Sequence, residues 1–475
     1  MAGAQQLLSL DSCRAMALRN NKQIGVSRVK QDVAKNLRKS ARTKYLPHVT
    51  ALGGYEYTSR EISLLSDDVK SELGSLGTKA VGDVQTATAS LLKELPVLAT
   101  LLGSSPTLQG IMGGIEGAGN GVGQRVVDEF RSDTRNLFAG AVVVTQPIFM
   151  GGAIVALNKM ADINEEMAAN STDSKRQETL YQIDQAYWQV VSLRHKQKLA
   201  QGYLDLIKKL DGDVQKMIRE GVATRSEGLS VSVKVNEAEM TLMKVNDGLT
   251  LSRMLLCQLC GLPISEDVVL VDEEAEELET VSMVPQKNME QAMEMRPELK
   301  MLQNVVDLSK QNTHLLKAGN LPQVALMGGY AFSNPNLYNG FQRKFGGVWN
   351  IGVMVRVPVW NWGDVAYKVR ASKGATTMAL LALDEAREKI ELQVNQSAFK
   401  VNEANKTLEL ARASVERANE NLRTANLGFQ EGVISSTTVM EAQTAWLQAA
   451  SQKIDAEINV KLSQVNLQKA LGTLY

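Results

Sequence analysis

Apolar residues recur at helical spacing over two long tracts of the chain. All ten prolines lie outside residues 148–262 and 359–475. Because proline breaks a helix interior, each tract can form very long helices. Large apolar residues lie seven apart in the second tract at Val394, Val401, Leu408, Val415, Leu422 and Phe429, and small ones at Ser397, Ala404, Ala411, Ala418 and Ala425. This heptad pattern predicts coiled-coil packing, in which the small residues let neighbouring helices approach closely.

Strict alternation predicts four strands outside these tracts. The clearest lies within 346–359, where apolar side chains at odd positions from Trp349 to Val359 alternate with polar or small ones. We expect two strand pairs, 46–59 with 132–147 and 321–334 with 346–359. Strands of about 9–12 residues have the length of tilted transmembrane strands. Aromatic residues near the strand ends predict an interfacial girdle, made of Tyr55, Tyr57, Phe138, Tyr330, Phe332 and Trp349 at one rim and Phe149, Trp360 and Trp362 at the other.

The chain repeats itself at two offsets. Residues 13–55 align with 288–330, pairing Leu46-Pro47 with Leu321-Pro322. A shorter offset pairs Pro147 with Pro358 and Gly221 with Gly432. We infer an internal two-fold duplication, in which each copy reads as helix, strand, strand, long helix, turn and shorter helix.

Four strands are too few to close a barrel within one chain, since about eight are the minimum. Open sheet edges are not tolerated in lipid, so strands that span a membrane would require several chains to share one barrel. The alternative is a soluble β-sandwich head on a coiled-coil scaffold. The two readings differ in the aromatic residues, because a soluble head has no reason to place them at both ends of an apolar band.

Composition narrows the possible functions. Lys plus Arg and Asp plus Glu are each 52, which argues against a protein that binds nucleic acid by neutralising phosphates. No run of eighteen apolar residues predicts a transmembrane helix. Three histidines far apart and three cysteines predict neither a metal site nor a disulfide scaffold. No catalytic triad or phosphate-binding glycine loop is present, so we expect no enzyme activity and no cofactor.

The order of these features resembles the TolC-like outer membrane factors of Gram-negative bacteria, also called the outer membrane efflux protein family. The opening Leu8-Ser9-Leu10-Asp11, the stretch from Gly428 to Ala442 and the ending Ala470-Leu471-Gly472 resemble the family's start, helix-hairpin tip and last helix. The resemblance implies an α+β membrane protein. In it, a homotrimer forms a 12-stranded outer-membrane barrel, four strands per chain, that continues into a periplasmic α-helical barrel of coiled-coil hairpins.

The same resemblance implies a passive exit duct for efflux or type I secretion. Its partners would be a periplasmic membrane-fusion adaptor and, indirectly, an inner-membrane pump of the RND, ABC or MFS type. The pattern Ala2-x-Ala4 matches a signal-peptide cleavage site, so we expect export by an N-terminal signal that is absent or trimmed here. Cys13 has no lipobox before it, and lipidation is not expected.

Glycines interrupt the heptads at two hairpin tips, near 221–226 and 432–437. The resemblance makes these the adaptor-docking loops, with exposed Val433 and Ile434 suited to a partner contact; the other reading is a simple turn. The expected docking residues are Gly221, Val222, Ala223, Thr224, Gly432, Val433, Ile434 and Ser435. The expected residues of a periplasmic gate are Arg225, Glu227, Thr438 and Glu441, although a single Glu on a helix is often merely solvated.

The remaining segments complete the expected organisation. Residues 1–45 form an N-terminal segment with a first short helix, and 299–320 form its counterpart in the second repeat. Residues 60–131 form an extracellular insertion that either caps the outer mouth or is a plain surface loop, and 262–298 form an equatorial segment. The two long hairpins occupy 148–261 and 360–475. Within the first hairpin, Cys257-Gln-Leu-Cys260 has the spacing of a redox motif but ends a long helix, which favours a packing role.

Overall fold

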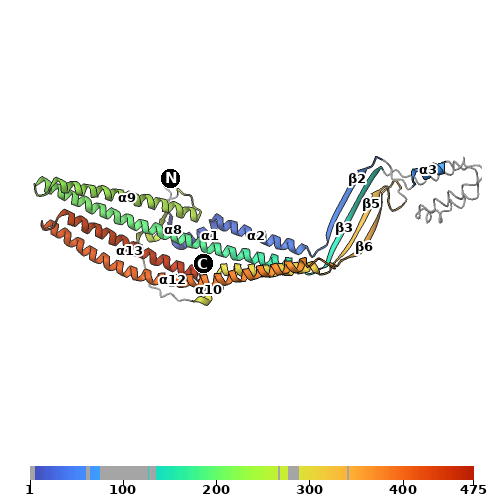
Figure 1. Cartoon of the computed structure of the whole chain (residues 1–475). Coiled ribbons are helices and arrows are strands. Elements are labelled where there is room, and N and C mark those ends of the chain that lie inside the picture. The colour runs from blue at the N-terminus through green and yellow to red at the C-terminus, as the bar shows by residue number, and fades with distance from the viewer. Residues whose placement is uncertain are drawn as a thin grey trace, which may run out of the picture. The chain divides into compact units, whose positions relative to one another are not determined.

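The computed structural model describes residues 6–59, 65–74, 127, 135–265, 268–275, 288–339 and 342–475. Most of the expected extracellular insertion, and residues 276–287 of the expected equatorial segment, lie outside these ranges. The chain divides into two compact units. The helical unit comprises Met1–Arg42, Gly152–Gly319 and Trp360–Tyr475, and the β unit comprises Thr43–Gly151 and Asn320–Val359. Each is described below by itself (Figure 1).

Two pairs of long helices build most of the helical unit. The longer members are α8 (Ala153–Arg219) and α12 (Asp364–Gln430), each of 67 residues, or about 100 Å at 1.5 Å per residue. Their shorter partners are α9 (Arg225–Cys260) and α13 (Ser436–Ala470). The remaining helices of this unit are α1 (Leu10–Asn20), α2 (Lys22–Thr43), α10 (Met289–Met295) and α11 (Pro297–Lys317), with short 3-10 turns at Val271–Glu274 and Ala318–Asn320.

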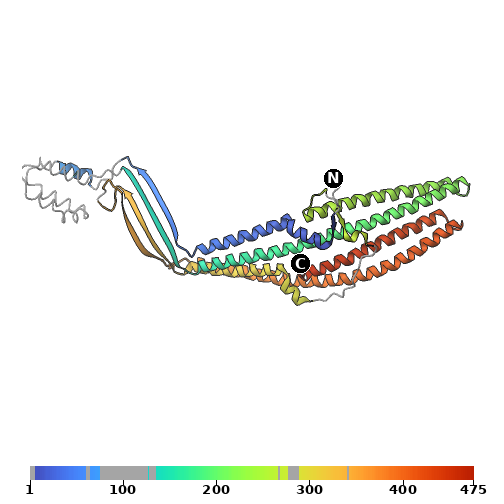
Figure 2. The same ribbon diagram turned by 180° about the vertical axis from the view of Figure 1, so that it is seen from behind.

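The long helices lie side by side in a fixed order. Helix α9 packs on α8, α8 on α13, and α13 on α12, as both ribbon views show (Figures 1 and 2). Beyond the ends of α9 and α13, α11 packs between α8 and α12. Helices α9 and α12 are therefore the outer members of the row, and α8 and α13 the inner ones.

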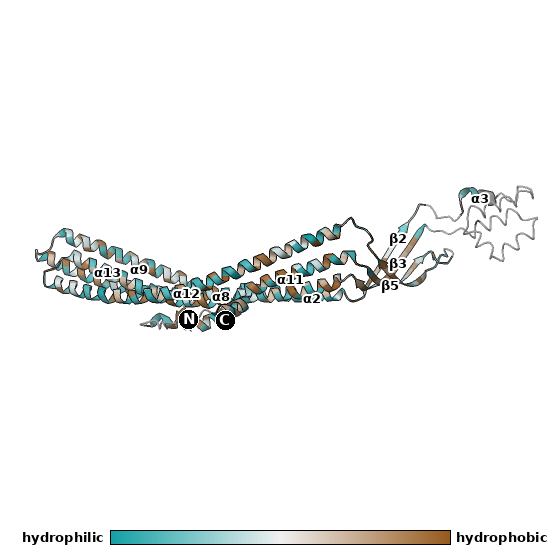
Figure 3. Cartoon of the chain, turned by 60° about the horizontal axis from the view of Figure 1, so that its bottom comes forward, coloured by the Kyte–Doolittle hydropathy of each residue, from teal (hydrophilic) through white to brown (hydrophobic). Residues whose placement is uncertain are grey.

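The predicted heptads form the seams between these helices. Every heptad residue of α12 named above is buried or half-buried. The facing positions on α13 are also small and seven apart: Ala442, Ala449, Ala456, Ser463 and Ala470 are all buried. Small side chains on both helices let α12 and α13 pack closely, with larger Leu408 and Val460 beside them in one cluster. Hydrophobic residues recur along the long helices (Figure 3).

The β unit holds one four-stranded antiparallel sheet. Its strands are β2 (His48–Tyr57), β3 (Asn136–Met150), β5 (Gln323–Asn334) and β6 (Gly346–Arg356), in the order β2-β3-β5-β6. Registers include Tyr55 opposite Phe138 and Tyr330 opposite Trp349. A bulge interrupts the β3–β5 ladder between Pro147 and Phe149. A short helix, α3 (Asp67–Gly74), lies between β2 and β3 in sequence.

The elements differ from the sequence expectations at a few points. Strand β6 ends at Arg356, so Val357 and Val359 lie beyond it; Pro358, which has no N–H to donate, separates them. Two helices, α1 and α2, replace the single first helix expected in 1–45. A two-stranded parallel sheet, β1 (Gln6–Leu8) with β4 (Val268–Leu270), was not anticipated.

Candidate functional site

Both hairpin tips are tight turns built on glycine. Gly221 and Gly432 have φ of 75° and 76°, in the left-handed region that glycine occupies without a steric penalty. After each glycine, the chain enters the next helix through a side-chain cap. The Thr224 hydroxyl accepts from the Glu227 N–H at 3.2 Å, and the Ser435 hydroxyl accepts from the Thr438 N–H at 3.3 Å. Four of the expected docking and gate residues thus start helices.

The two caps are not equivalent. Glu227 Oε2 also accepts from the Thr224 N–H at 2.7 Å and from its hydroxyl at 3.0 Å, which completes a reciprocal capping box. These hydrogen bonds, first from the backbone and then from the hydroxyl, hold the pKa of Glu227 below the usual glutamate range. At the second tip a threonine, Thr438, stands at this position, and its hydroxyl lies 3.1 Å from that of Ser435.

The apolar residues of the tips point in different directions. Val222 and Val433 are 71% and 79% exposed. Ile434, which we expected to be exposed, is half-buried: it packs against the cluster of Val439 and Met440, and its side chain fills the space beside Gly428. The exposed apolar surface therefore comes from one valine at each tip.

The other gate candidates are exposed side chains. Arg225 lies on the first turn of α9, and Glu441 lies near the start of α13. Within the described part of this single chain neither side chain forms an ion pair within 4.0 Å. Each is free to meet a group from outside the chain.

The two faces of the sheet differ in chemistry. Residues directly opposite in the ladder share a face, and faces alternate along each strand. One face carries Val49, Tyr55, Phe138, Tyr330 and Trp349 with their apolar neighbours, and in the described strands it has no charged side chain. The basic and acidic residues of the four strands, His48, Glu56 and Arg356, all lie on the other face.

Aromatic rings gather on the apolar face near one end of the sheet. The tilted rings of Tyr55 and Phe138 have centres 4.6 Å apart, and the stacked rings of Tyr330 and Phe332 have centres 6.3 Å apart. Phe345, just before β6, lies 6.5 Å from Phe138 and 6.4 Å from Phe332. Sequence reasoning missed Phe345 because it precedes the alternating pattern. Tyr57 and Trp349 belong to the same end, and Phe149 to the opposite one.

Trp360 and Trp362, placed in the second rim from the sequence, belong to the helical unit. Their rings meet edge to face at 5.8 Å, and their side chains are 75% and 84% exposed. Trp362 has φ of 53°, the only positive φ of a non-glycine residue in the described ranges.

Exposed apolar side chains of the helical unit are concentrated on its outermost helices. On α12 they include Phe399 and Leu410, 72% and 71% exposed. The inner helix α13, which is described along its whole length, exposes no large hydrophobic side chain. The exposed residues form stripes: Val26, Val29, Val33 and Leu37 on α2; Leu229, Val233, Met240, Met243 and Leu251 on α9; and Met378, Leu381, Leu392, Phe399 and Leu410 on α12.

The described part of the equatorial segment is tied to α8 and α9 by ion pairs. Arg253 contacts Glu273 at 2.6 Å, and the Glu273 side chain is only 1% exposed. Arg194 and Lys198 contact Glu274 at 2.9 and 2.8 Å, and these two cations, Lys198 first, lower the pKa of Glu274 to about 2. Tyr187 donates a 2.5 Å hydrogen bond to Asp272. These contacts hold residues 271–274 against helices α8 and α9.

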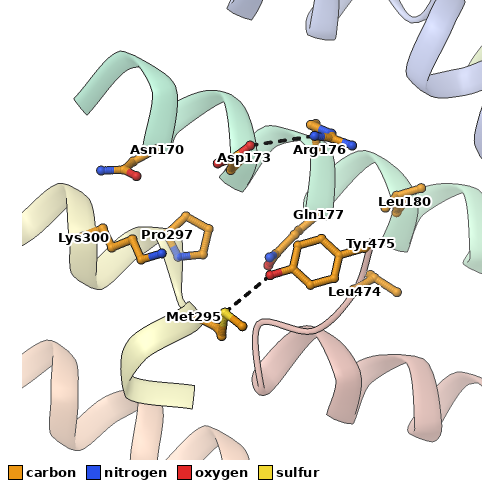
Figure 4. A pocket seen from close by; sticks show the side chains of 10 residues that line it. All are labelled: Asn170, Asp173, Arg176, Gln177, Leu180, Met295, Pro297, Lys300, Leu474 and Tyr475. Atoms are coloured by element: carbon orange, nitrogen blue, oxygen red, sulfur yellow. Dashed lines mark hydrogen bonds and ion pairs between the residues drawn. The ribbon is translucent and has the colours of Figure 1, made fainter. Parts of the chain in front are cut away.

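A cavity of about 250 Å³ lies near the described chain end (Figure 4). Its walls come from α8, α10, α11 and the residues after α13. The Tyr475 hydroxyl donates to the Met295 sulfur at 3.7 Å, and Arg176 lies 4.0 Å from Asp173 (Figure 4). No group of three or more His, Cys, Asp or Glu in the described ranges could hold a metal ion. Among those residues, no helix is both long and apolar enough to cross a membrane.

Comparisons with known proteins give a consistent result. The sequence model described as outer membrane efflux protein matches residues 116–262 and 288–473. The outer membrane protein TolC of Vibrio cholerae is 22% identical over 349 residues, which are 71% of this chain and 77% of that protein. The fold is similar to the outer membrane protein VceC of Vibrio cholerae, with a TM-score of 0.72, 12% identity, and 98% and 96% of the two chains covered.

A second solved structure, the open state of the MtrE outer membrane channel of Neisseria gonorrhoeae, has a TM-score of 0.70 and 14% identity. The similarity covers 98% of this chain and 89% of that one. Because the family match extends over most of the sequence and the structural similarity over nearly all of it, this chain belongs to the outer membrane efflux protein family.

Proposed function

We propose that three copies of this chain form one exit duct of a tripartite efflux or type I secretion system. As a member of the outer membrane efflux protein family, the chain is an outer-membrane transport protein and not an enzyme. Family membership argues against the alternative of a soluble coiled-coil scaffold. The observation that supports this assembly is that both sides of the single chain present surfaces that no other described part of the chain covers.

The sheet has an unpaired strand at each of its two edges. Among the described strands, β2 and β6 each pair on one side only, and an unpaired strand edge is not tolerated in lipid. The strands alternate in direction along the order β2-β3-β5-β6, so β6 can pair antiparallel with β2 of the next copy. Three copies then close a 12-stranded barrel, with the uncharged face toward lipid and His48, Glu56 and Arg356 toward the lumen.

The helical unit likewise exposes apolar side chains on both sides. Helices α2 and α9, which carry two of the stripes, lie at one side of the row, and α12, which carries the third, lies at the other (Figures 1 and 2). In a closed ring, α12 would cover α9 and α2 of the neighbouring copy, which removes all three stripes from water. The duct would continue from the barrel into this ring in the periplasm, with residues 262–298 as a belt around its middle.

The proposed duplication explains why each copy contributes two tips. Helices α8 and α12 have equal lengths, and their start and end residues lie the same number of positions apart in the sequence. Three copies would present six tips to a periplasmic adaptor, with Val222 and Val433 as the apolar contacts beside Gly221, Ala223, Thr224, Gly432, Ile434 and Ser435. The inner-membrane pump would act through that adaptor.

The entrance would be controlled by the charged residues next to the tips. Three-fold symmetry would turn exposed Glu441 into an acidic ring, which favours cations, while Arg225 is placed to pair across a copy boundary. Glu227 and Thr438 would act indirectly, because they hold the helix starts. The aromatic girdle would then mark the membrane interfaces.

The mass of the native particle in mild detergent tests this proposal. We expect a particle of three 51.9 kDa chains that precipitates when detergent is removed. A monomer or dimer that stays dispersed in plain buffer would overturn both the barrel and the ring.

A further inference from the structure

Three cysteines from distant parts of the sequence meet in one core. Cys13 lies on α1, and Cys257 and Cys260 lie on the last turns of α9. Their side chains are 0%, 1% and 0% exposed and belong to a single hydrophobic cluster. The function proposed above uses none of these thiols.

Cys260 reaches Cys13 across the junction of the two helices. The Cys260 thiol donates to the carbonyl oxygen of Cys13 at 3.8 Å, and both side chains pack in the same cluster. The end of α1 also packs on the end of α9: the Asn20 side-chain amide donates to the Cys260 carbonyl at 3.5 Å, and a Cβ on Gly261 would lie 2.6 Å from the Asn20 Cβ. These contacts hold the two helices together, and a disulfide requires the Cβ atoms of its cysteines to lie about 3.5–4.5 Å apart.

Cys257 is in a different position. It lies one turn earlier on α9 and packs in the same cluster. It stands on the same helix as Cys260, so a bond between these two would link only one turn of α9 to itself. Of the two α9 cysteines, Cys260 is the one whose sulfur lies 3.8 Å from the Cys13 carbonyl oxygen, so the geometry favours the pair of Cys13 with Cys260.

The chemistry of this pair depends on its compartment, and here the inference rests on the proposed function, which places the helical unit in the periplasm. That compartment is kept oxidising by thiol–disulfide oxidases. Two thiols packed in one cluster there are a substrate for oxidation, whereas in a reducing compartment they would stay as they are.

We propose that Cys13 and Cys260 form a disulfide bond in the exported protein. One cysteine thiolate attacks the disulfide of a periplasmic oxidase and forms a mixed disulfide, releasing one oxidase thiolate. The second cysteine thiolate then attacks the sulfur of its partner, which releases the other oxidase thiolate. The pair loses two protons and two electrons, and the oxidase disulfide is reduced to a dithiol.

Burial determines when this happens. Because neither side chain is exposed in the folded chain, the oxidase must act before α1 packs on the end of α9. The product is a covalent link between the first helix and the end of the first hairpin, and it encloses the intervening strands and long helix in one loop. Such a long loop restricts the unfolded chain strongly.

Peptide mapping of protein taken from outer membranes tests the bond. Cells are quenched with iodoacetamide, and the protein is digested without reductant. We expect a Cys13 peptide linked to a Cys260 peptide, separated by dithiothreitol, and an alkylated Cys257. Three alkylated cysteines, or a link through Cys257, would overturn the inference. The native mass of the same sample reports separately on the trimer, so either proposal can fail alone.

Thermal unfolding with and without dithiothreitol gives a second readout. Reduction should lower the unfolding temperature of the native protein, and of the control Cys257→Ala, by about 5 °C or more. It should leave Cys13→Ala and Cys260→Ala unchanged. An equal effect of reductant on all variants would contradict the bond.

Discussion

Helices α12 and α13 run side by side, yet their surfaces differ. Both are long and carry small residues at heptad spacing on the seam between them. Helix α13 also packs on α8, and each of its large apolar side chains is buried or half-buried. Along most of its length α12 lies at the margin of the row and leaves a stripe exposed that includes Phe399 and Leu410. The exposed apolar residues thus follow the number of neighbours that each helix has within the single chain, and they mark the surface that the proposed ring would cover.

The largest loss of stability is expected from a substitution inside the row of helices, in the seam between α12 and α13. Val460 on α13 is fully buried beside Ala404 and Leu408 of α12. Val460→Asp would bury an unpaired carboxylate, at a cost of about 3–5 kcal/mol. We expect little folded protein in the membrane fraction, measured by immunoblot and circular dichroism. A normal yield of stable trimer would mean that this seam is not the core of the unit.

A charge on the outer helix α12 should instead weaken assembly and leave the folding of the single chain intact. Phe399→Glu should expose no core and leave the chain helical, but in the proposed trimer it would remove about 1.5–3 kcal/mol of apolar burial from each of the three copy boundaries. The measurement is native mass in mild detergent, with circular dichroism as the control for folding. Glu403→Gln, a change at another exposed position of α12, should remain trimeric. A Phe399→Glu trimer of normal stability would contradict the conclusion that the exposed stripe of α12 is an assembly surface.

The starts of the two short helices should respond differently to loss of their caps. The outer helix α9 relies on a complete capping box, whereas α13 begins with a single hydroxyl cap and buries Ser436, Val439 and Met440 just behind it. Replacing a cap by alanine costs about 1 kcal/mol. We therefore expect Thr224→Ala to speed amide exchange over the first turn of α9 about fivefold. Ser435→Ala should have a smaller effect on α13, and the reverse order would contradict this account.

Acid should produce the smallest effect, and at only one of the tips. The pKa of Glu227 is lower in the folded chain than in the unfolded one, so its stabilisation is present above the ordinary glutamate pKa of about 4.3. It is lost as the pH falls through the lowered value. Amide exchange at the start of α9, corrected for intrinsic rates, should rise below about pH 4. The start of α13, which has Thr438 in place of this glutamate, serves as the internal control.

Local periodicity predicted much of this architecture. The absence of proline and the heptads from Val394 to Phe429 indicated α12, and alternation from Trp349 indicated β6. Two features could not be predicted in this way. The pairing of Gln6–Leu8 with Val268–Leu270 joins segments too short to show a period. Within the tip, Val433 and Ile434 are adjacent apolar residues, and only the path of the turn determines that Ile434 points inward.

The contact of Cys13 with Cys260 was equally invisible, because it depends on how α1 meets the end of α9. The CxxC spacing drew attention to Cys257 and Cys260, whereas the cysteine that Cys260 contacts lies on another helix. Long-range contacts of this kind follow from packing and not from any local pattern.

The equal lengths of α8 and α12 limit how the length of the duct can change in evolution. Inserting one residue into either 67-residue helix would rotate every later position by about 100° and turn the seam away from its partner. An insertion of seven residues keeps the seam, but in one helix alone it would leave the two tips at different depths. Lengthening is therefore tolerated only as matched heptads in both halves, so relatives of this chain should differ in reach by whole, paired steps.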